Sequence, residues 1–353
     1  MPRRQTVKNL LIFVAICVAA AVSLSGRGGA SARAGATPVA SRVVMVEDAQ
    51  ATSAFEPRPD IVQGMVDRGL LKFTGKENIA EAWRAVVSTQ DVVGLKVYCA
   101  PGPTSGTRPA VVVAVVKGLL QAGLPPHNIV IWDKQLSDLR AAGFDELARR
   151  FNVRLAGSAN SGWDEKTFYS KPLLGELVSG DYEFDKDGTR TGRNSYVSKL
   201  LTHDITRVIT ITPLLNHNEA GVTGNLYSLA AGSVDNFARF ELQAERLAEA
   251  VPEICVLPAL TDHDYLALSI TDALIGQYQG ENSSLLHYSK ALNQVWISKD
   301  PVALDVLAIQ ELDREREARK VAPAKSNADL YQNAQMLQLG TDDPAKVQIE
   351  MLK

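Results

Sequence analysis

The chain has 353 residues, of which 46% are hydrophobic and 22% are charged, and its formal charge is −3. These values are typical of an ordinary globular protein and exclude the disordered, collagen-like and multi-span membrane classes. At roughly 150 residues per domain, the length allows one large domain or two small ones. Aromatic residues make up only 6% and acidic residues outnumber basic ones, so we expect no nucleic-acid partner.

The N-terminus has the features of a cleaved signal peptide. The first eight residues carry three basic side chains and no acidic one, and an apolar run at 10–24 and a small-residue stretch ending Ala-Arg-Ala at 32–34 follow. The apolar run is shorter than the roughly 20 residues that a transmembrane helix needs. We therefore predict a signal peptide over 1–34, export to the periplasm, and no membrane contact after cleavage.

Two export routes stay open. The pair Arg3-Arg4 resembles a twin-arginine signal, although Thr6 stands where that signal usually has a bulky apolar residue. The alternative is a plain secretory signal that happens to begin with two arginines. On either route, removal of 1–34 takes away five basic side chains and no acidic ones, so the formal charge of the mature chain moves from −3 to −8.

Two cysteines, Cys99 and Cys255, lie beyond the signal peptide. They are too few for a four-cysteine zinc or iron-sulfur site within one chain, so no iron-sulfur cluster is expected. An oxidising compartment would permit one disulfide. Because both residues lie in apolar, strand-like runs, we expect free buried thiols. The sequence does not identify any other cofactor.

The first half of the mature chain predicts a β-α-β unit. Residues 92–99 form a nearly continuous apolar run, which is typical of a strand covered on both faces. Residues 108–123 have helical apolar spacing, and the run at 129–132 predicts the next strand. The two strands should be parallel with a right-handed crossover. Upstream, we expect a flexible lead-in over 35–59 and two helices over 60–87.

The second half repeats the pattern. We predict strands at 207–212, where Pro213 should end the strand, at 266–271 and at 294–298, followed by a helix over 302–319. The polar segment 157–196 has little apolar periodicity and is predicted to be an insertion or lid. The fold class is therefore α/β, a mostly parallel sheet flanked by helices with a polar insertion in the middle of the chain. It forms a single domain over 60–320, with a C-terminal tail over 321–353.

In open α/β sheets, ligands bind at the carboxyl ends of the strands. Four predicted loops lie there, at 100–107, 133–137, 216–225 and 272–284. Their polar residues give a candidate site for a small molecule or a metal ion. The candidate catalytic residues are His217, Asp133 and Asp272, and the candidate ligand-binding residues are Lys96, Thr107, Arg108 and Thr223.

Several of these residues have a structural alternative. His217 could transfer protons or bind a metal, but a histidine held by hydrogen bonds inside the fold fits the sequence equally well. Lys96 could be a buried cation that holds an acidic ligand, or it could point outward from an edge strand. The loop 102–107 could hold an anion with its backbone amides, although simple turn formation explains its glycines.

Five stretches in this order resemble the bacterial domain-of-unknown-function 362 family, with the resemblance extending from about residue 66 to residue 317. They are Asp91–Val97, Thr107–Val112, His217–Thr223, Asp272–Leu274 and Ser298–Asp305. The resemblance implies an α/β fold without an agreed activity, in a family whose members are commonly exported. Some relatives carry ferredoxin-type cysteine motifs, which this chain lacks.

The chain also departs from the family pattern at presumed site positions. Tyr98 stands where relatives tend to have asparagine. The lysine that usually precedes the histidine loop is replaced by Leu215 or Asn216, and a Lys-Asn pair in the following helix by Tyr227-Ser228. The resemblance therefore does not extend to the polar groups at these positions.

Two hypotheses from different classes follow. The first is an exported metal- or cofactor-assisted enzyme that uses His217 as acid, base or ligand, with Asp133 and Asp272 nearby. In this hypothesis Lys96 or Arg108 holds an anionic substrate, and the convergence of these residues on one edge of the sheet favours it. The second is a non-catalytic exported protein that binds a small ligand or a metal, and the replaced site lysines favour it.

Overall fold

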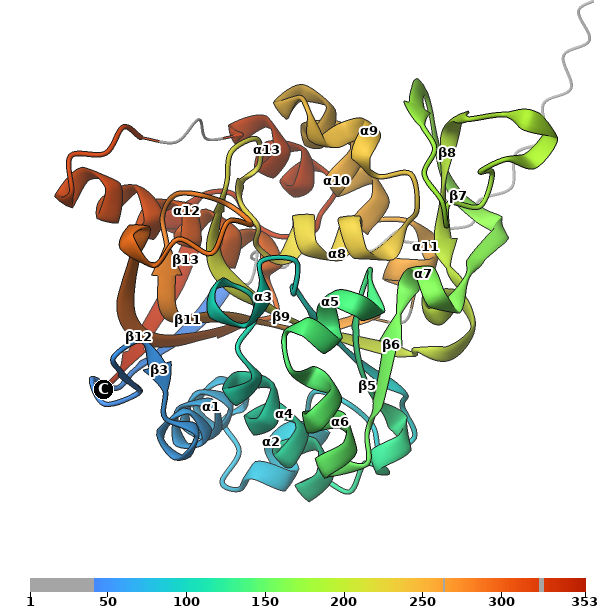
Figure 1. Ribbon diagram of the computed structural model, residues 1–353. Coiled ribbons are helices and arrows are strands. Elements are labelled where there is room, and N and C mark those ends of the chain that lie inside the picture. The colour runs from blue at the N-terminus through green and yellow to red at the C-terminus, as the bar shows by residue number, and fades with distance from the viewer. Residues whose placement is uncertain (1–40, 263, 324–326) are drawn as a thin grey trace, which may run out of the picture. The chain divides into compact units, whose positions relative to one another are not determined.

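The computed structural model describes residues 41–262, 264–323 and 327–353, which belong to one compact unit (Figure 1). The predicted signal peptide lies outside the described residues, as does the first part of the predicted lead-in. None of the helices in the described ranges is long and apolar enough to cross a membrane.

The described strands form a nine-stranded main sheet and two small two-stranded sheets. The main sheet has the order β13-β1-β12-β11-β9-β4-β5-β6, and β10 pairs with β9 off this path. The strands are β1 Ser41–Glu47, β2 Thr52–Ser53, β3 Glu56–Pro57, β4 Val93–Val97, β5 Ile129–Asp133, β6 Arg154–Gly157, β7 Trp163–Glu176, β8 Thr191–Ser198, β9 Arg207–His217, β10 Gly221–Val222, β11 Leu266–Gln277, β12 Ser289–Ser298 and β13 Val347–Leu352.

Parallel pairing dominates the main sheet. Strands β11, β9, β4, β5 and β6 pair in parallel, each with its neighbour. Strand β12 runs antiparallel to both β11 and β1, and β13 is parallel to β1. The predicted fold class, an α/β fold with a mostly parallel sheet, is confirmed.

Helices cover both faces of this sheet (Figure 1). One apolar core lies between the sheet and α1, α2, α4, α5 and α6, and the other lies between the sheet and α8, α10, α12 and α13. The helices are α1 Pro59–Thr74, α2 Ile79–Arg84, α3 Gly102–Ser105, α4 Pro109–Gln121, α5 Leu136–Ala141, α6 Phe144–Phe151, α7 Ser158–Ser161, α8 Asn225–Ser233, α9 Ala238–Glu241, α10 Ala244–Cys255, α11 Pro258–Thr261, α12 Pro301–Ala318 and α13 Ala328–Met336.

The two cores explain why the strands read as continuous apolar runs. Side chains along a strand alternate between the two faces. In β5, Val130 and Trp132 enter the core that contains α8, whereas Ile129 and Ile131 enter the core that contains α4. A strand covered on both faces is apolar at most positions, which removes the polar alternation of a half-exposed strand.

The structure differs from the prediction at both ends of the domain. Residues 41–47, placed in a flexible lead-in by the sequence, form β1 inside the sheet, where Val43, Val44 and Val46 are fully buried. The predicted tail 321–353 contains α13 and β13, and β13 pairs with β1. Strands close to a chain end resemble linkers when they are short, because only the pairing across the sheet reveals their burial.

Two central strands are also longer than predicted. Strand β9 continues through Pro213 to His217, and β11 continues to Gln277. Proline removes one donor from the ladder. The register between these strands shifts just after Pro213, between Asp272 and Gln277. Beyond the proline, Leu215 still pairs with Gln277 of β11, and Asn216 and His217 pair with β10.

Most of the predicted insertion 157–196 forms the separate β7-β8 hairpin. Arg239 of α9 donates hydrogen bonds to the Leu173 carbonyl and to Ser195 Oγ, one on each strand. Tyr169 of β7 donates to Glu253 of α10. These contacts attach the hairpin to the helices beside α8.

The burial of β1 gives a test of its role. We expect Val44→Ala to lower the free energy of unfolding by about 2 kcal/mol, because it removes two buried methyl groups and leaves a cavity. Val178→Ala is the matched control, since Val178 is 59% exposed and its truncation should have almost no effect. Urea unfolding measures both variants, and equal stabilities would contradict the buried position of β1.

Candidate functional site

The four strands β4, β5, β9 and β11 are parallel, and they lie next to one another in the sheet. Their carboxyl ends therefore lie at one edge, as the sequence predicted. Hydrogen bonds join the loops that follow β4 and β11. Ser105 Oγ donates to Gln277 Oε1 at 2.6 Å, and Ser284 Oγ donates to the Pro101 carbonyl at 2.9 Å.

Lys96 is a buried cation in the middle of this edge. Its side chain is fully buried, and its Nζ lies 2.9 Å from Asp133 Oδ1 and 2.9 Å from Ser228 Oγ. Nζ also donates to the Val97 carbonyl at 2.6 Å. Because Leu95 and Val97 enter the α4 core, Lys96 points to the opposite face, toward α8. Of the two alternatives for Lys96, the structure shows the buried cation.

Asp133 is occupied by this ion pair and by the backbone. Its Oδ2 accepts from the Cys99 backbone N–H at 2.8 Å, and its Oδ1 accepts from the Lys134 N–H at 2.8 Å. Three donors thus satisfy a carboxylate that is 5% exposed. This carboxylate therefore serves as the counter-ion of Lys96.

Arg108 and Asp272 form a second buried pair. Arg108 Nη1 lies 3.2 Å from Asp272 Oδ1, and the Arg108 backbone N–H donates to Asp272 Oδ2 at 2.9 Å. Arg108 Nη2 donates to the carbonyls of Thr104 and Ile275. The guanidinium therefore ties the start of α4 to β11, and its charge is already balanced.

The two candidate threonines have different positions. Thr107 Oγ1 donates to the Ile211 carbonyl at 2.7 Å and accepts from the Tyr98 backbone N–H at 2.9 Å, so it joins β4 to β9. Thr223 is 1% exposed, and its hydroxyl has no hydrogen-bond partner in the part of the chain that the structure describes. Its backbone N–H donates to the Leu215 carbonyl. Within the described ranges, neither hydroxyl forms a hydrogen bond with His217.

His217 ends strand β9, and its ring is fixed by backbone groups. The β10 turn brings the N–H groups of Glu219 and Ala220 to 3.2 and 3.1 Å from His217 Nδ1. Two N–H donors facing one nitrogen require that nitrogen to be an unprotonated acceptor. Neutral His217 therefore carries its proton on Nε2.

Burial keeps His217 neutral. Its pKa lies below the ordinary value of 6.5 because burial disfavours the imidazolium form, while the charges of Glu241 and Glu219 oppose this effect. Above its lowered pKa the ring is uncharged and serves as a hydrogen-bond donor through Nε2. Glu281 Oε1 lies 4.0 Å from His217 Nδ1. The same oxygen accepts a hydrogen bond from the Asn218 backbone N–H.

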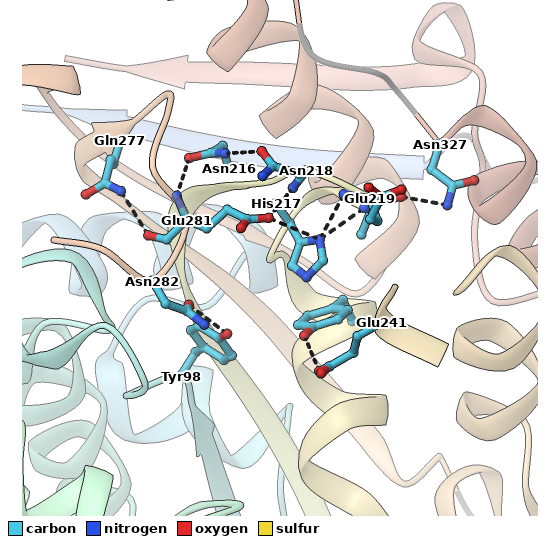
Figure 2. A network of polar contacts seen from close by, with 12 residues as sticks. Tyr98, Asn216, His217, Asn218, Glu219, Glu241, Gln277, Glu281, Asn282 and Asn327 are labelled. Atoms are coloured by element: carbon cyan, nitrogen blue, oxygen red, sulfur yellow. Dashed lines mark hydrogen bonds and ion pairs between the residues drawn. The ribbon is translucent and has the colours of Figure 1, made fainter. Parts of the chain in front are cut away.

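Aromatic and polar side chains surround this ring (Figure 2). We define the His217 cluster as His217, Tyr98, Tyr227, Glu241, Glu281 and Asn282. The centroid of the Tyr227 ring lies 4.2 Å from the centroid of the His217 ring and 6.4 Å from that of the Tyr98 ring. Tyr98 Oη donates to Asn282 Oδ1 at 2.9 Å, and Tyr227 Oη donates to Glu241 Oε1 at 2.8 Å. In Figure 2, Tyr98 and Asn282 lie below His217 on the left, and Glu241 lies below it on the right.

Burial also fixes the protonation of the two tyrosines. It raises the pKa of Tyr98 and of Tyr227 above the ordinary value of 10, and nearby carboxylates such as Glu241 add to the effect. Both residues are therefore neutral phenols. The cluster presents hydroxyl, imidazole and amide groups, together with two carboxylates.

Most residues of this cluster carried no functional signal in the sequence. Tyr98 and Tyr227 were noted only as departures from the family pattern, and Glu241 and Asn282 carried no motif. Asp305 was also missed as a site-forming residue, although it ends the Ser298–Asp305 stretch that carried part of the resemblance. Its carboxylate accepts from the backbone N–H groups of Asn225 and Leu226 at 2.7 and 3.0 Å. Asp305 thus caps α8, the helix that carries Tyr227 and Ser228.

The five candidate residues other than the two threonines therefore separate into three groups. Lys96 pairs with Asp133, Arg108 pairs with Asp272, and His217 packs against Tyr227. Neither a hydrogen bond nor an ion pair joins these groups directly within the described ranges. Three or more histidine, cysteine, aspartate or glutamate side chains arranged to hold a metal ion are not found among the described residues.

The Lys96–Asp133 pair gives a test of how the edge is assembled. We expect Lys96→Met to lower the free energy of unfolding by about 3–5 kcal/mol, because it leaves the Asp133 carboxylate buried without a cation. The double variant Lys96→Met/Asp133→Leu should regain much of this loss, since it removes both charges. Urea unfolding measures the two variants, and a single variant no less stable than the double variant would contradict the pairing.

Among solved structures, the chain is similar to a Thermotoga maritima protein determined by structural genomics, with 13% identity and a TM-score of 0.37. That likeness covers 75% of this chain and 60% of the other protein. Comparison with curated proteins gives no match. The model of the family described as "Domain of unknown function (DUF362)" matches residues 93–310, more than half of the chain. The chain, with its parallel strands and its histidine loop, therefore belongs to the DUF362 family.

Proposed function

We propose that this protein is an exported small-molecule-binding protein whose ligand contacts the His217 cluster at the carboxyl edge of the sheet. One observation carries the proposal, the fixed orientation of the His217 ring. Two backbone N–H groups hold Nδ1, so the ring offers the Nε2–H group as a hydrogen-bond donor. A donor held in this way suits an oxygen atom of a bound molecule.

The same geometry argues against His217 as a base or a metal ligand. Either role at Nε2 needs a neutral ring with its proton on Nδ1, because a base or ligand must offer a lone pair. A proton on Nδ1 would face the N–H groups of Glu219 and Ala220, which are 3.2 and 3.1 Å away. Both hydrogen bonds would be lost, so this form is disfavoured.

The positions of the other candidate residues also favour binding over catalysis. Asp133 and Asp272, the expected catalytic carboxylates, each neutralise a buried cation. A general base must be within hydrogen-bond reach of its substrate and free to accept a proton. The described residues therefore support the binding hypothesis better than the metal- or cofactor-assisted enzyme.

Replacement of the histidine tests the proposal. The full chain, the His217→Ala variant and the His127→Ala control are purified from the exported fraction and compared by native mass spectrometry. We expect the full chain and the control to retain a small molecule that His217→Ala loses, since His127 is exposed in the loop before β5. Nitrogen-15 NMR at pH 7 should show the neutral His217 ring protonated on Nε2. A ring protonated on Nδ1, or equal retention by the three proteins, would refute the proposal.

Export is part of the proposal and has its own test. The signal predicted over 1–34 should be removed, so the exported protein should begin near residue 35, as N-terminal sequencing of the periplasmic fraction would show. If export follows the twin-arginine route, Arg3→Lys/Arg4→Lys should leave the precursor in the cytoplasm. An uncleaved N-terminus would contradict the predicted signal. Normal export of the double variant would instead identify a plain secretory signal.

A further inference from the structure

The charged side chains that belong to the His217 cluster itself are acidic. Lys96 and Arg108, the cations expected to hold an anionic ligand, are neutralised by Asp133 and Asp272. His217 is kept neutral by burial. The remaining charges of the cluster are the carboxylates of Glu241 and Glu281. In the described part of the chain, neither carboxylate lies within ion-pair distance of a lysine or arginine.

Glu241 is the carboxylate best placed to meet a ligand. It ends α9 and is partly buried. Its Oε1 accepts from Tyr227 Oη at 2.8 Å, and Oε2 accepts no hydrogen bond from the residues that the structure describes. The charge of Glu241 also acts on His217, Tyr98 and Tyr227, whose pKa values it raises, so it lies near all three rings.

Aromatic rings lie beside this carboxylate. The Tyr227 ring contacts the rings of His217, Tyr98 and Phe237, with centroids 4.2, 6.4 and 5.7 Å away. Tyrosine and phenylalanine rings attract cations through the negative potential of their faces. A carboxylate next to several such rings is chemically suited to an organic cation. The carboxylate attracts the charge of the cation, and the rings contact its apolar part.

Lys134 is the one feature that points to an anion instead. Its Nζ lies 6.0 Å from the Phe237 ring, and it forms no ion pair in the described ranges. Burial lowers the pKa of Lys134, although Asp181, Glu241 and Asp235 oppose the effect. Lys134 is thus surrounded by acidic groups and partly desolvated, which leaves it poorly suited to attract an anion.

We infer that the ligand of this site is an organic cation, an amine or ammonium compound whose charge meets Glu241 and whose apolar part packs on Tyr98 and Tyr227. This inference rests on the proposed binding function and adds the chemical class of the ligand. An oxygen atom of the same molecule would accept from His217 Nε2–H.

Three probes of matched shape test the charge preference. The full chain is titrated with 3-methylbutylammonium, 3-methylbutanol and 3-methylbutanoate, and the ring signals of His217, Tyr98 and Tyr227 are followed by NMR. We expect the ammonium probe to bind at least about tenfold more tightly than either of the others. Tighter binding of the carboxylate probe would overturn the inference, as would equal or undetectable binding of all three.

Matched variants test whether Glu241 is the carboxylate that binds the ammonium group. Glu241→Gln keeps an oxygen that can accept from Tyr227 and removes the charge, so binding of the ammonium probe should weaken about tenfold. Glu245→Gln is the control, because Glu245 is exposed on α10 and forms no ion pair in the described part. Equal affinities of these two variants would overturn the role of Glu241.

The outcomes also separate this inference from the proposed function. If native mass spectrometry finds an anionic or neutral molecule whose retention requires His217, the binding function stands and the cation inference fails. If the His217→Ala variant retains the molecule as well as the full chain does, both the proposed binding site and the cation inference fail.

Discussion

The buried ion pair between Lys96 and Asp133 is the constraint on which the carboxyl edge of the sheet depends. A fully buried ammonium is tolerated only when a carboxylate and further hydrogen-bond partners replace its water. Here the partner comes from the neighbouring strand and Ser228 from α8, each 2.9 Å from Nζ. The pair therefore fixes the ends of β4 and β5 and one face of α8 at the same time.

Helix α8 links this pair to the His217 cluster. Ser228 contacts Lys96, and the preceding residue, Tyr227, packs against His217. The start of the helix is held by Asp305, whose pKa burial raises to about 6. A side chain at Gly224 would place its Cβ 2.6 Å from the Asp305 carboxylate. The close approach of α12 to this turn thus requires glycine, and it sets the position of both residues on α8.

The departures from the family pattern are neighbours in space. Tyr98 and Tyr227 are in ring contact, Ser228 bonds to Lys96, and the Asn216 side chain accepts from the Glu281 N–H at 3.0 Å. The resemblance implies lysine and asparagine groups at these positions in relatives. Replacement of such groups by tyrosine and serine makes this edge more aromatic and less positive. The surface proposed here as the ligand site therefore differs from the one that the resemblance implies.

Local patterns in the sequence were enough to predict the α/β fold class, the order of the loops that follow the parallel strands, and the common edge at which these loops lie. These follow from continuous apolar runs and helical spacing, which are local properties of the chain. The sequence also identified His217, Lys96 and Asp133 as polar residues at that edge. It missed β1 and β13, because a short strand near a chain end is recognised only by its partners.

Which polar residues contact one another depends on the tertiary fold. Lys96 and Asp133 are 37 residues apart, and Tyr227 and Glu241 come from different helices. Whether a carboxylate is a free base or the counter-ion of a buried lysine depends on groups distant in the chain. The same holds for the tautomer of His217, since it is set by two backbone N–H groups whose direction the β10 turn determines. Spacing along the sequence carries no information about these directions, and so the chemistry of the site became visible only in the folded chain.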